Sequence, residues 1–239
     1  MSRLSRSWQE SKEWPLWGQI SFASLMVLVA GLVVGVYTSS SNEVEENVPS
    51  GARPVVTTSS STRDLEQLLT PLALVEPTAV PEYERALFGG DWRDSDHDCE
   101  STRTEVLIQQ SRITPVVLGC EVISGLWKDP WSSAEFTDPT EIDIDHTVPL
   151  ANAWRSGAWK WSTQRRADFA NDLRDVDALV AVSSSENRAK GDSGPDQWRP
   201  PSRNSWCRYA RSWARTKAKW GLSATRAEWL ALQSMVSMC

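Results

Sequence analysis

The chain has 239 residues and a hydrophobic content of 40%, enough for one large folded domain or two small ones, which excludes a chain that is disordered throughout. A formal net charge of -6, if evenly spread, would argue against a nucleic-acid partner, because phosphate binding needs a positive surface. The stretch 199–219, however, has no Asp or Glu and carries Arg199, Arg203, Arg208, Arg211, Arg215, Lys217 and Lys219. Local charge therefore decides which partners the chain can bind.

The N-terminal segment predicts a membrane anchor. Residues 18–37 carry no charge, and as a helix their apolar centre would rise about 27 Å, close to the roughly 30 Å of a bilayer's hydrocarbon core. Basic residues lie in the preceding segment, 1–17, and acidic residues follow, so the positive-inside rule places 1–17 in the cytoplasm and the rest of the chain outside. A cleaved signal peptide is the alternative, which would make the protein secreted.

The next segment, 38–62, is rich in Ser, Thr, Pro and acidic residues and has no apolar period, which is typical of a flexible stalk. We therefore expect the folded domain to occupy residues 63–239.

Cysteine use agrees with export. The four cysteines, Cys99, Cys120, Cys207 and Cys239, include no Cys-x-x-Cys pair that would indicate a zinc site. An even number of cysteines outside a membrane predicts disulfides, and four cysteines allow three pairings. Pairing of sequence neighbours, Cys99 with Cys120 and Cys207 with Cys239, is the simplest of the three.

The first half of the domain predicts a mixture of helices and short strands. Helical spacing covers 101–111, and two short strands are expected around Gly119 and Cys120. A strand-like alternation follows at 141–146. Two helices are expected over 149–161 and 162–173, the second with Ser162 or Thr163 as its N-cap.

The second half begins with a short buried strand over 178–182, followed by a helix that starts near Ser184, after a Ser183 and Glu186 capping-box pattern, and stops at Gly191. An amphipathic helix is expected from about 204 to 220, and a last helix should start at the Thr225 and Glu228 capping box and run to the end of the chain. Trp206, Trp213 and Trp220 repeat at seven, which favours a buried seam over base stacking. The fold class is α+β with few, short strands.

Asp145, His146 and Asn187 are the residues that suggest chemistry. A carboxylate at a strand end can hold a hard divalent cation while a neighbouring neutral imidazole takes a proton from water. The carbonyl oxygen of Asn187, early in its capped helix, is an acceptable second ligand. Taken singly, Asp145 and His146 are also typical of a surface pair, and Asn187 of a helix cap.

Four stretches together resemble the HNH endonucleases with a ββα-metal site, in the exported actinobacterial branch related to the C-terminal domain of GmrSD restriction enzymes: "DIDHTVPLANAW", "FANDL", "LVAVSSSENRAKGD" and "QWRP". The resemblance extends from about Tyr83 to Cys239. It implies an HNH-like ββα core elaborated with further helices, with Asp145 and Asn187 as metal ligands, His146 as general base and Lys190 on a phosphate or the developing charge.

The chain departs from the HNH pattern at the middle Asn, where the expected position offers Asp177 and Ala178. We expect Asp177 or Asn171 to hold the histidine loop instead. The stretch between Asp145 and Asn187 is also longer than in compact members of the family.

The resemblance implies a metal-dependent endonuclease that cleaves DNA with little sequence preference, using one divalent ion, Mg²⁺ or Mn²⁺. The candidate DNA contacts are Arg188, Arg208, Arg211, Arg215 and Lys219, with solvated surface charge as the alternative. No motif for a protein partner is recognisable, and we expect a monomer. The alternative function is a non-catalytic cell-surface protein that binds DNA or another polyanion.

One further pattern is open to two interpretations. Asp94, Asp96, Asp98 and Glu105 fall at EF-hand positions, which allows calcium binding, but Cys99 stands where the sharp turn requires Gly. We therefore favour a turn held by a disulfide.

Overall fold

The computed structural model describes residues 67, 69, 70 and 72–239. The predicted cytoplasmic segment 1–17, anchor 18–37 and stalk 38–62 lie outside the described residues, so the structure does not test them. Within the part of the chain that the structure describes, no helix is both long and apolar enough to cross a membrane.

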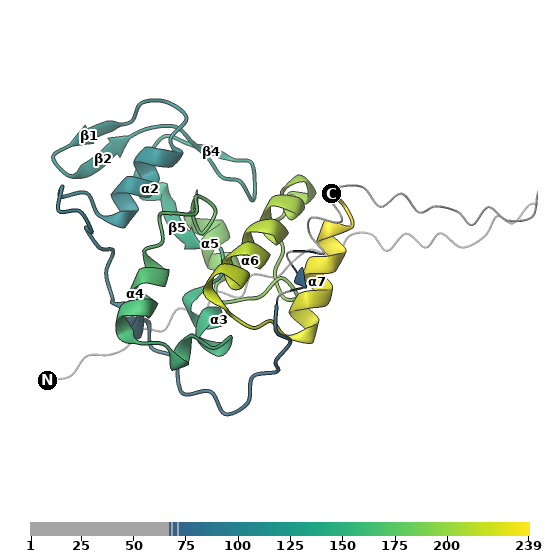
Figure 1. Cartoon of the computed structure of the whole chain (residues 1–239). Coiled ribbons are helices and arrows are strands. Elements are labelled where there is room, and N and C mark those ends of the chain that lie inside the picture. The colour runs from purple at the N-terminus through teal and green to yellow at the C-terminus, as the bar shows by residue number, and fades with distance from the viewer. Residues whose placement is uncertain (1–66, 68, 71) are drawn as a thin grey trace, which may run out of the picture. The chain divides into compact units, whose positions relative to one another are not determined.

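The predicted α+β class is confirmed: helices are combined with short strands (Figure 1), and the strands of the described residues form three separate two-stranded antiparallel sheets. In chain order the elements are η1 (Arg85–Phe88), α2 (Thr102–Gln110), β1 (Val116–Leu118), β2 (Glu121–Ser124), β3 (Trp127–Lys128), β4 (Glu135–Phe136), η2 (Pro139–Glu141), β5 (Ile142–His146), α3 (Leu150–Arg155), η3 (Ala158–Lys160), α4 (Thr163–Ala170), β6 (Leu179–Ser183), α5 (Ser184–Lys190), η4 (Arg203–Ser205), α6 (Trp206–Trp220) and α7 (Arg226–Val236).

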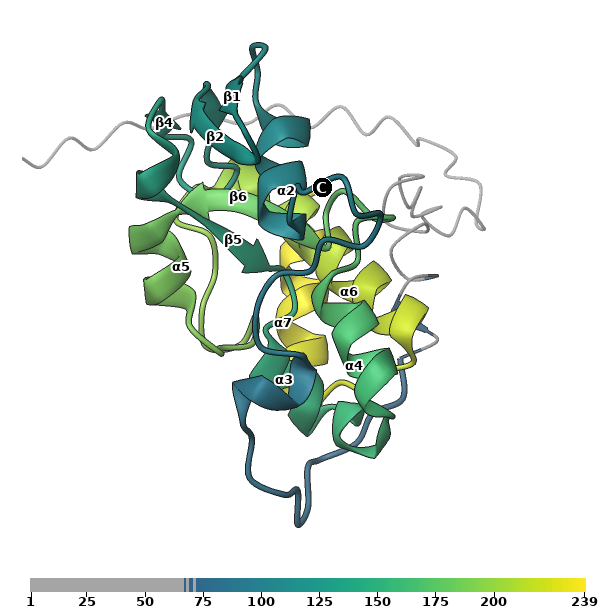
Figure 2. The same ribbon diagram turned by 90° about the vertical axis from the view of Figure 1, so that its left-hand side faces the viewer.

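The central feature is the antiparallel pair β5 and β6 with α5 directly after β6 (Figure 2). Their register pairs Ile142 with Ser183 and His146 with Leu179. The predicted helices between the two strands are α3 and α4, with the short turn η3 between them. After this insertion the chain continues as β6, which pairs with β5, so that residues far apart in sequence meet at one end of the pair.

The two faces of this strand pair are covered by different helices. Ile142 and Ile144 point to α2, where they form a buried cluster with Val106 and Leu107. The opposite face carries Asp143 and Asp145, whose carboxylates are bound by side chains of α5. Strand alternation therefore puts Asp143 and Asp145 on the face that adjoins α5, where Val180 and Val182 of β6 lie beside them and belong to the larger core.

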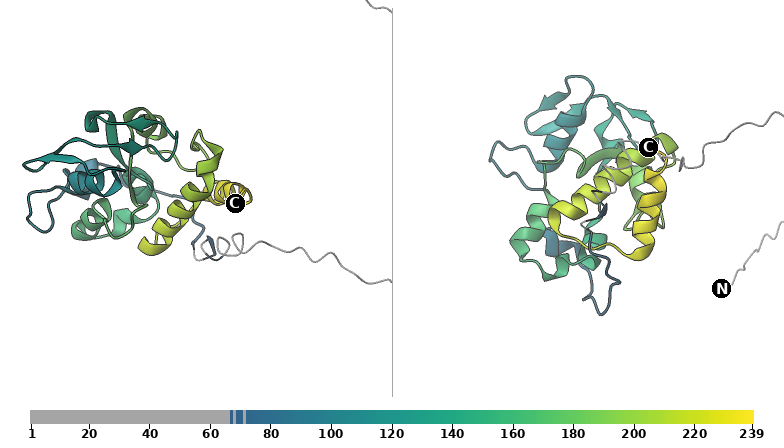
Figure 3. Two further views of the ribbon diagram at one scale, coloured as in Figure 1. Left: turned by 90° about the horizontal axis from the view of Figure 1, so that it is seen from above. Right: turned by 45° about the vertical axis from the view of Figure 1, so that its right-hand side comes forward.

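The C-terminal helices α6 and α7 pack side by side (Figure 3) and form part of the larger core. Trp213 and Trp220 of α6 are buried, as the period of seven predicted, while Trp206 is only partly buried. Lys217 is also buried and pairs with Glu228 of α7 at 2.6 Å. Glu228 completes a capping box with Thr225, which confirms the predicted start of this helix, although α7 ends at Val236 rather than at Cys239.

Of the two other predicted caps, Ser162 is confirmed and the Ser183 capping box is confirmed in part. Ser162 is the N-cap of α4 and accepts a hydrogen bond from the Arg165 N–H. Ser183 caps α5 by accepting from the Glu186 N–H, but the Ser183 N–H donates to a carboxylate oxygen of Asp129 at 3.0 Å. Asp129 thus makes the bond that a full capping box would assign to Glu186.

Two disulfides join the pairs that are neighbours in the sequence, Cys99 with Cys120 and Cys207 with Cys239. The first ties the loop before α2 to the β1–β2 turn, and the second ties the start of α6 to Cys239, three residues beyond the end of α7.

Candidate active site

The ends of β5 and α5 bring three predicted site residues together. Asp145, His146 and Asn187 all line one cleft of about 330 Å³, together with two arginines, Arg85 and Arg188. The cleft is also lined by Tyr83, Ile144, Pro149, Leu150, Ala151, Gly191 and Asp192. The β5–β6 register and the immediate start of α5 explain this proximity, because both elements end at the same edge.

His146 is held by two contacts. Its Nε2 lies 2.9 Å from the carbonyl oxygen of Ala170, the last residue of α4, and its ring stacks on Trp92 with centroids 5.2 Å apart and planes at 9°. A carbonyl oxygen only accepts, so Nε2 carries the proton and Nδ1 is left with a free lone pair. Burial, with a further contribution from the Arg85 charge, lowers the pKa of His146 to about 3, against the bond to Ala170. The free imidazole is therefore neutral near pH 7.

Asp145 is a buried carboxylate with a buried cation beside it. Its Oδ1 accepts from Lys190 Nζ at 2.6 Å, and its Oδ2 accepts from Trp131 Nε1 at 3.4 Å. Lys190 Nζ also donates to the carbonyl oxygen of His146 at 2.7 Å. Burial raises the pKa of Asp145, and the charge and hydrogen bond of Lys190 oppose that rise.

The position of Lys190 differs from the prediction. Its side chain is 0% exposed and does not line the cleft, so in this structure it contacts Asp145 and not the space where a phosphate would lie. Its place at the end of α5, on the side that faces β5, explains this burial. Lys190 links α5 to both Asp145 and the His146 backbone.

Asn187 lies one turn earlier on the same helix. Its Nδ2 donates to Oδ2 of Asp143 at 3.0 Å, and Ser184 donates to the other oxygen of the same carboxylate. The bond to a carboxylate fixes the orientation of the amide, which leaves the carbonyl oxygen of Asn187 to bind a ligand. Asp143 is the partner that orients Asn187, and sequence reasoning gave it no role.

Neither residue predicted to hold the histidine loop touches His146 with its side chain. The Asn171 side chain accepts from the Arg93 N–H and donates to the carbonyl of Ala167. The carbonyl oxygen of Asp177 accepts from the Thr147 hydroxyl at 2.6 Å. Each residue therefore forms a hydrogen bond with a segment beside His146: Asn171 binds the loop that carries Trp92, and Asp177 binds Thr147.

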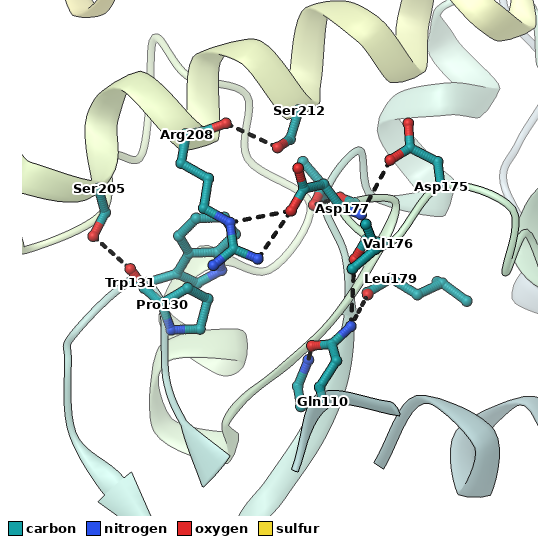
Figure 4. Close-up of polar contacts among 12 residues, drawn as sticks. Gln110, Pro130, Trp131, Asp175, Val176, Asp177, Leu179, Ser205, Arg208 and Ser212 are labelled. Carbon is teal, nitrogen blue, oxygen red and sulfur yellow. Dashed lines mark hydrogen bonds and ion pairs between the residues drawn. The ribbon is translucent and has the colours of Figure 1, made fainter. Parts of the chain in front are cut away.

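Most of the cations predicted to contact DNA on α6 are already paired. Arg208 and Arg215 bind opposite oxygens of Asp177, at 2.9 Å and 2.7 Å, and Lys219 binds Asp172 (Figure 4 shows the Arg208 pair). Burial acts to raise the pKa of Asp177, but the two arginines outweigh it and the pKa is lowered. Among the described residues, Arg211 has no ion-pair partner. Arg188 differs from all of these because it lines the cleft.

Sequence reasoning missed Arg85, Trp92 and Trp131. Arg85 lies on the short turn η1, far from any motif, and reaches the cleft only through the fold. The two tryptophans have no local signal either, because each contacts its partner, His146 or Asp145, across a long sequence separation.

The acidic loop before α2 has the form of a turn tied by a disulfide. Asp94 accepts from the backbone N–H groups of His97 and Cys99, and Cys99 has a positive φ of 79°. One oxygen each from Asp94, Asp96 and Asp98 lie within 4.8 Å of one another.

Comparison with known proteins gives a family match for this chain. The sequence model described as "GmrSD restriction endonucleases, C-terminal domain" matches residues 103–234, which include β5, β6 and α5. A protein of Arthroderma benhamiae described as an "uncharacterized secreted protein" is 45% identical over 139 residues, covering 58% of this chain and 68% of that protein. No solved structure matches. The match across β5, β6 and α5 shows that the chain belongs to the family of GmrSD restriction endonuclease C-terminal domains.

Proposed function

We propose that the protein is a metal-dependent endonuclease with an HNH-like ββα site, which hydrolyses phosphodiester bonds in DNA with little sequence preference. The observation that carries the proposal is the state of His146. Its Nε2 binds the Ala170 carbonyl, its ring is neutral, and Nδ1 keeps a free lone pair, while His146 lines a cleft together with Asp145 and Asn187. A neutral imidazole is the form that can take a proton from water.

Asp145 and Asn187 are the residues that would hold the metal. Both line the cleft, and they offer carboxylate and amide oxygens, the donors that Mg²⁺ and Mn²⁺ prefer. Each Asp145 oxygen accepts one hydrogen bond, which leaves a lone pair for a further ligand. The residues therefore fit a hard divalent ion. The Lys190 charge offsets that of Asp145, so we expect weak metal binding until substrate phosphate adds negative charge.

The reaction follows from these positions. The bound metal would supply Lewis-acid stabilisation of charge on the phosphate and the leaving oxygen. His146 Nδ1 accepts the proton of the attacking water, while Arg85 and Arg188 hold the phosphate at the cleft. The expected products carry a 5′-phosphate and a 3′-hydroxyl. A bound phosphate offsets the Arg85 charge and so raises the pKa of His146 from its free value, which makes the imidazole a stronger base.

The site of action that we propose is outside the cytoplasm. Two disulfides are typical of oxidising compartments, and the Arthroderma benhamiae relative is described as secreted. The predicted anchor over 18–37 would hold the nuclease domain at the outer surface of the membrane, and its cleavage would release the domain.

The direct test is incubation of the purified protein with supercoiled plasmid. We expect nicking with Mg²⁺ or Mn²⁺, none in EDTA, and recovery when excess Mg²⁺ is added back, because the metal that the oxygen ligands would hold stabilises the negative charge on the leaving oxygen. Full activity in EDTA would contradict the metal mechanism. Plasmid binding without cleavage under every metal condition would favour the non-catalytic polyanion-binding alternative.

Salt dependence separates the two candidate DNA surfaces. If Arg85 and Arg188 contact phosphates, replacing both with Gln should lower the slope of log K against log salt by about 1.8 for duplex DNA, at about 0.9 for each lost contact. Binding would be measured in EDTA, so that cleavage does not interfere. The matched control is Arg211→Gln, the unpaired arginine of α6. A change in slope for Arg211→Gln with none for the double variant would move the DNA surface to α6.

A further inference from the structure

The loop that precedes α2 contacts the candidate base, His146. Trp92 lies in this loop, is partly buried, and packs against the apolar cluster under β5 and β6. Its ring is nearly parallel to the His146 ring, with planes at 9° and centroids 5.2 Å apart. Nothing in the sequence around Trp92 indicates this contact, because the two residues are joined only by the fold.

The hydrogen bond to Ala170 does not by itself fix the direction of Nδ1. One hydrogen bond at Nε2 sets the position of one ring atom, but the ring plane can still turn about that bond. Stacking on a flat partner removes this freedom, because the two planes must stay parallel to keep their contact. The carbonyl and the indole together determine where the Nδ1 lone pair points.

The placement of Trp92 is itself tied to the segment that holds His146. The Arg93 N–H donates to Oδ1 of Asn171, the residue directly after Ala170. On the other side, the Arg93 carbonyl accepts from the backbone N–H and the hydroxyl of Thr102, at the start of α2. The indole and the Ala170 carbonyl are therefore held in one connected unit.

We propose that Trp92 is a positioning residue for His146: its indole face sets the plane of the imidazole, so that Nδ1 points at the attacking water in the cleft. The inference rests on the proposed nuclease function, because it concerns the same base. It gives Asn171 an indirect role, which is to hold the loop that carries Trp92. Trp92 touches neither substrate nor metal in this assignment.

The test compares Trp92→Phe, which keeps a flat face, with Trp92→Leu, which keeps apolar bulk without one. We expect kcat for plasmid nicking to stay within about threefold of wild type for Trp92→Phe and to fall on the order of 10- to 100-fold for Trp92→Leu, because misplacing a catalytic group costs rate at this scale. KM and DNA affinity in EDTA should not change in either variant. A purely structural role would instead lower stability and activity together, so thermal midpoints are measured for both.

An activity-independent measurement separates this inference from the proposed function. A stacked indole shields the His146 ring protons, so their NMR signals, assigned with His146→Ala, should move downfield in Trp92→Leu and much less in Trp92→Phe. Equal kcat for the Leu and Phe variants of an active enzyme would overturn the positioning role. Absence of nicking by the wild-type protein would overturn the nuclease function and the catalytic part of this inference, while unshifted signals in Trp92→Leu would overturn the stacking itself.

Discussion

Replacing His146 with alanine should lower the rate of DNA cleavage by about 10²- to 10⁴-fold and leave DNA affinity unchanged. A general base acts on the transition state, so its loss lowers kcat and not ground-state binding. Nδ1 is the atom whose loss matters, because Nε2 is committed to the Ala170 carbonyl. Single-turnover cleavage with Mg²⁺ measures the rate, and binding in EDTA measures the affinity.

His97→Ala is the matched control, since His97 is the other histidine of the chain and is exposed on the acidic loop. It should cleave at the wild-type rate. If His146→Ala retained wild-type activity, or if both variants lost activity equally, the role of His146 as base would be wrong. A decrease caused by unfolding would be visible as a lower thermal midpoint, which is measured for each variant.

Lys190→Met should destabilise the fold by about 3–5 kcal/mol, the range for removing one partner of a buried ion pair. The variant leaves the carboxylate of Asp145, which is 3% exposed, with a single hydrogen bond from Trp131. It also removes the donor to the His146 carbonyl. The free energy of unfolding, from urea titration at pH 8, measures the loss.

The double variant Asp145→Asn with Lys190→Met completes the cycle. It removes both charges, so most of the lost stability should return, and a double variant as unstable as Lys190→Met would contradict the ion-pair account.

The pH dependence of stability gives a second check. Without Lys190, burial raises the pKa of Asp145 further above its unfolded value, so the native state binds the extra proton. Stability of Lys190→Met should therefore improve as pH falls from 8 to 5, and the deficit should be largest at pH 8.

The elements that sequence predicted well are those with local signals. Ser162 and Thr225 identify helix starts because an N-cap hydroxyl must face the third N–H after it, a requirement confined to one turn. The β5–β6 pair and α5 follow from alternation, a short apolar run and a cap. Asp145, His146 and Asn187 could be placed together because α5 follows β6 directly and runs along β5, so that both elements end at the same edge.

The contacts that sequence could not predict are those set by distant partners. Lys190 looked available for phosphate because spacing shows which helix face a residue occupies, but not what covers that face. Arg208 and Arg215 looked free on an amphipathic helix, and their pairing with Asp177 depends on the loop before β6. Arg85 reaches the cleft, and Trp92 reaches the His146 ring, from a segment more than fifty residues before His146 in the chain.

The buried pair of Asp145 and Lys190 has a consequence for the divergence of the family. Because loss of either partner strands a charge in the interior, the two positions can change only together, whereas His146 can be lost without leaving a buried charge. A related protein that has lost catalytic activity would keep Asp145 and Lys190 because the fold requires them, even after His146 has been substituted. The presence of both the acid and the lysine in a relative therefore indicates that it has the same fold. The residue at the position of His146 indicates whether it is catalytic.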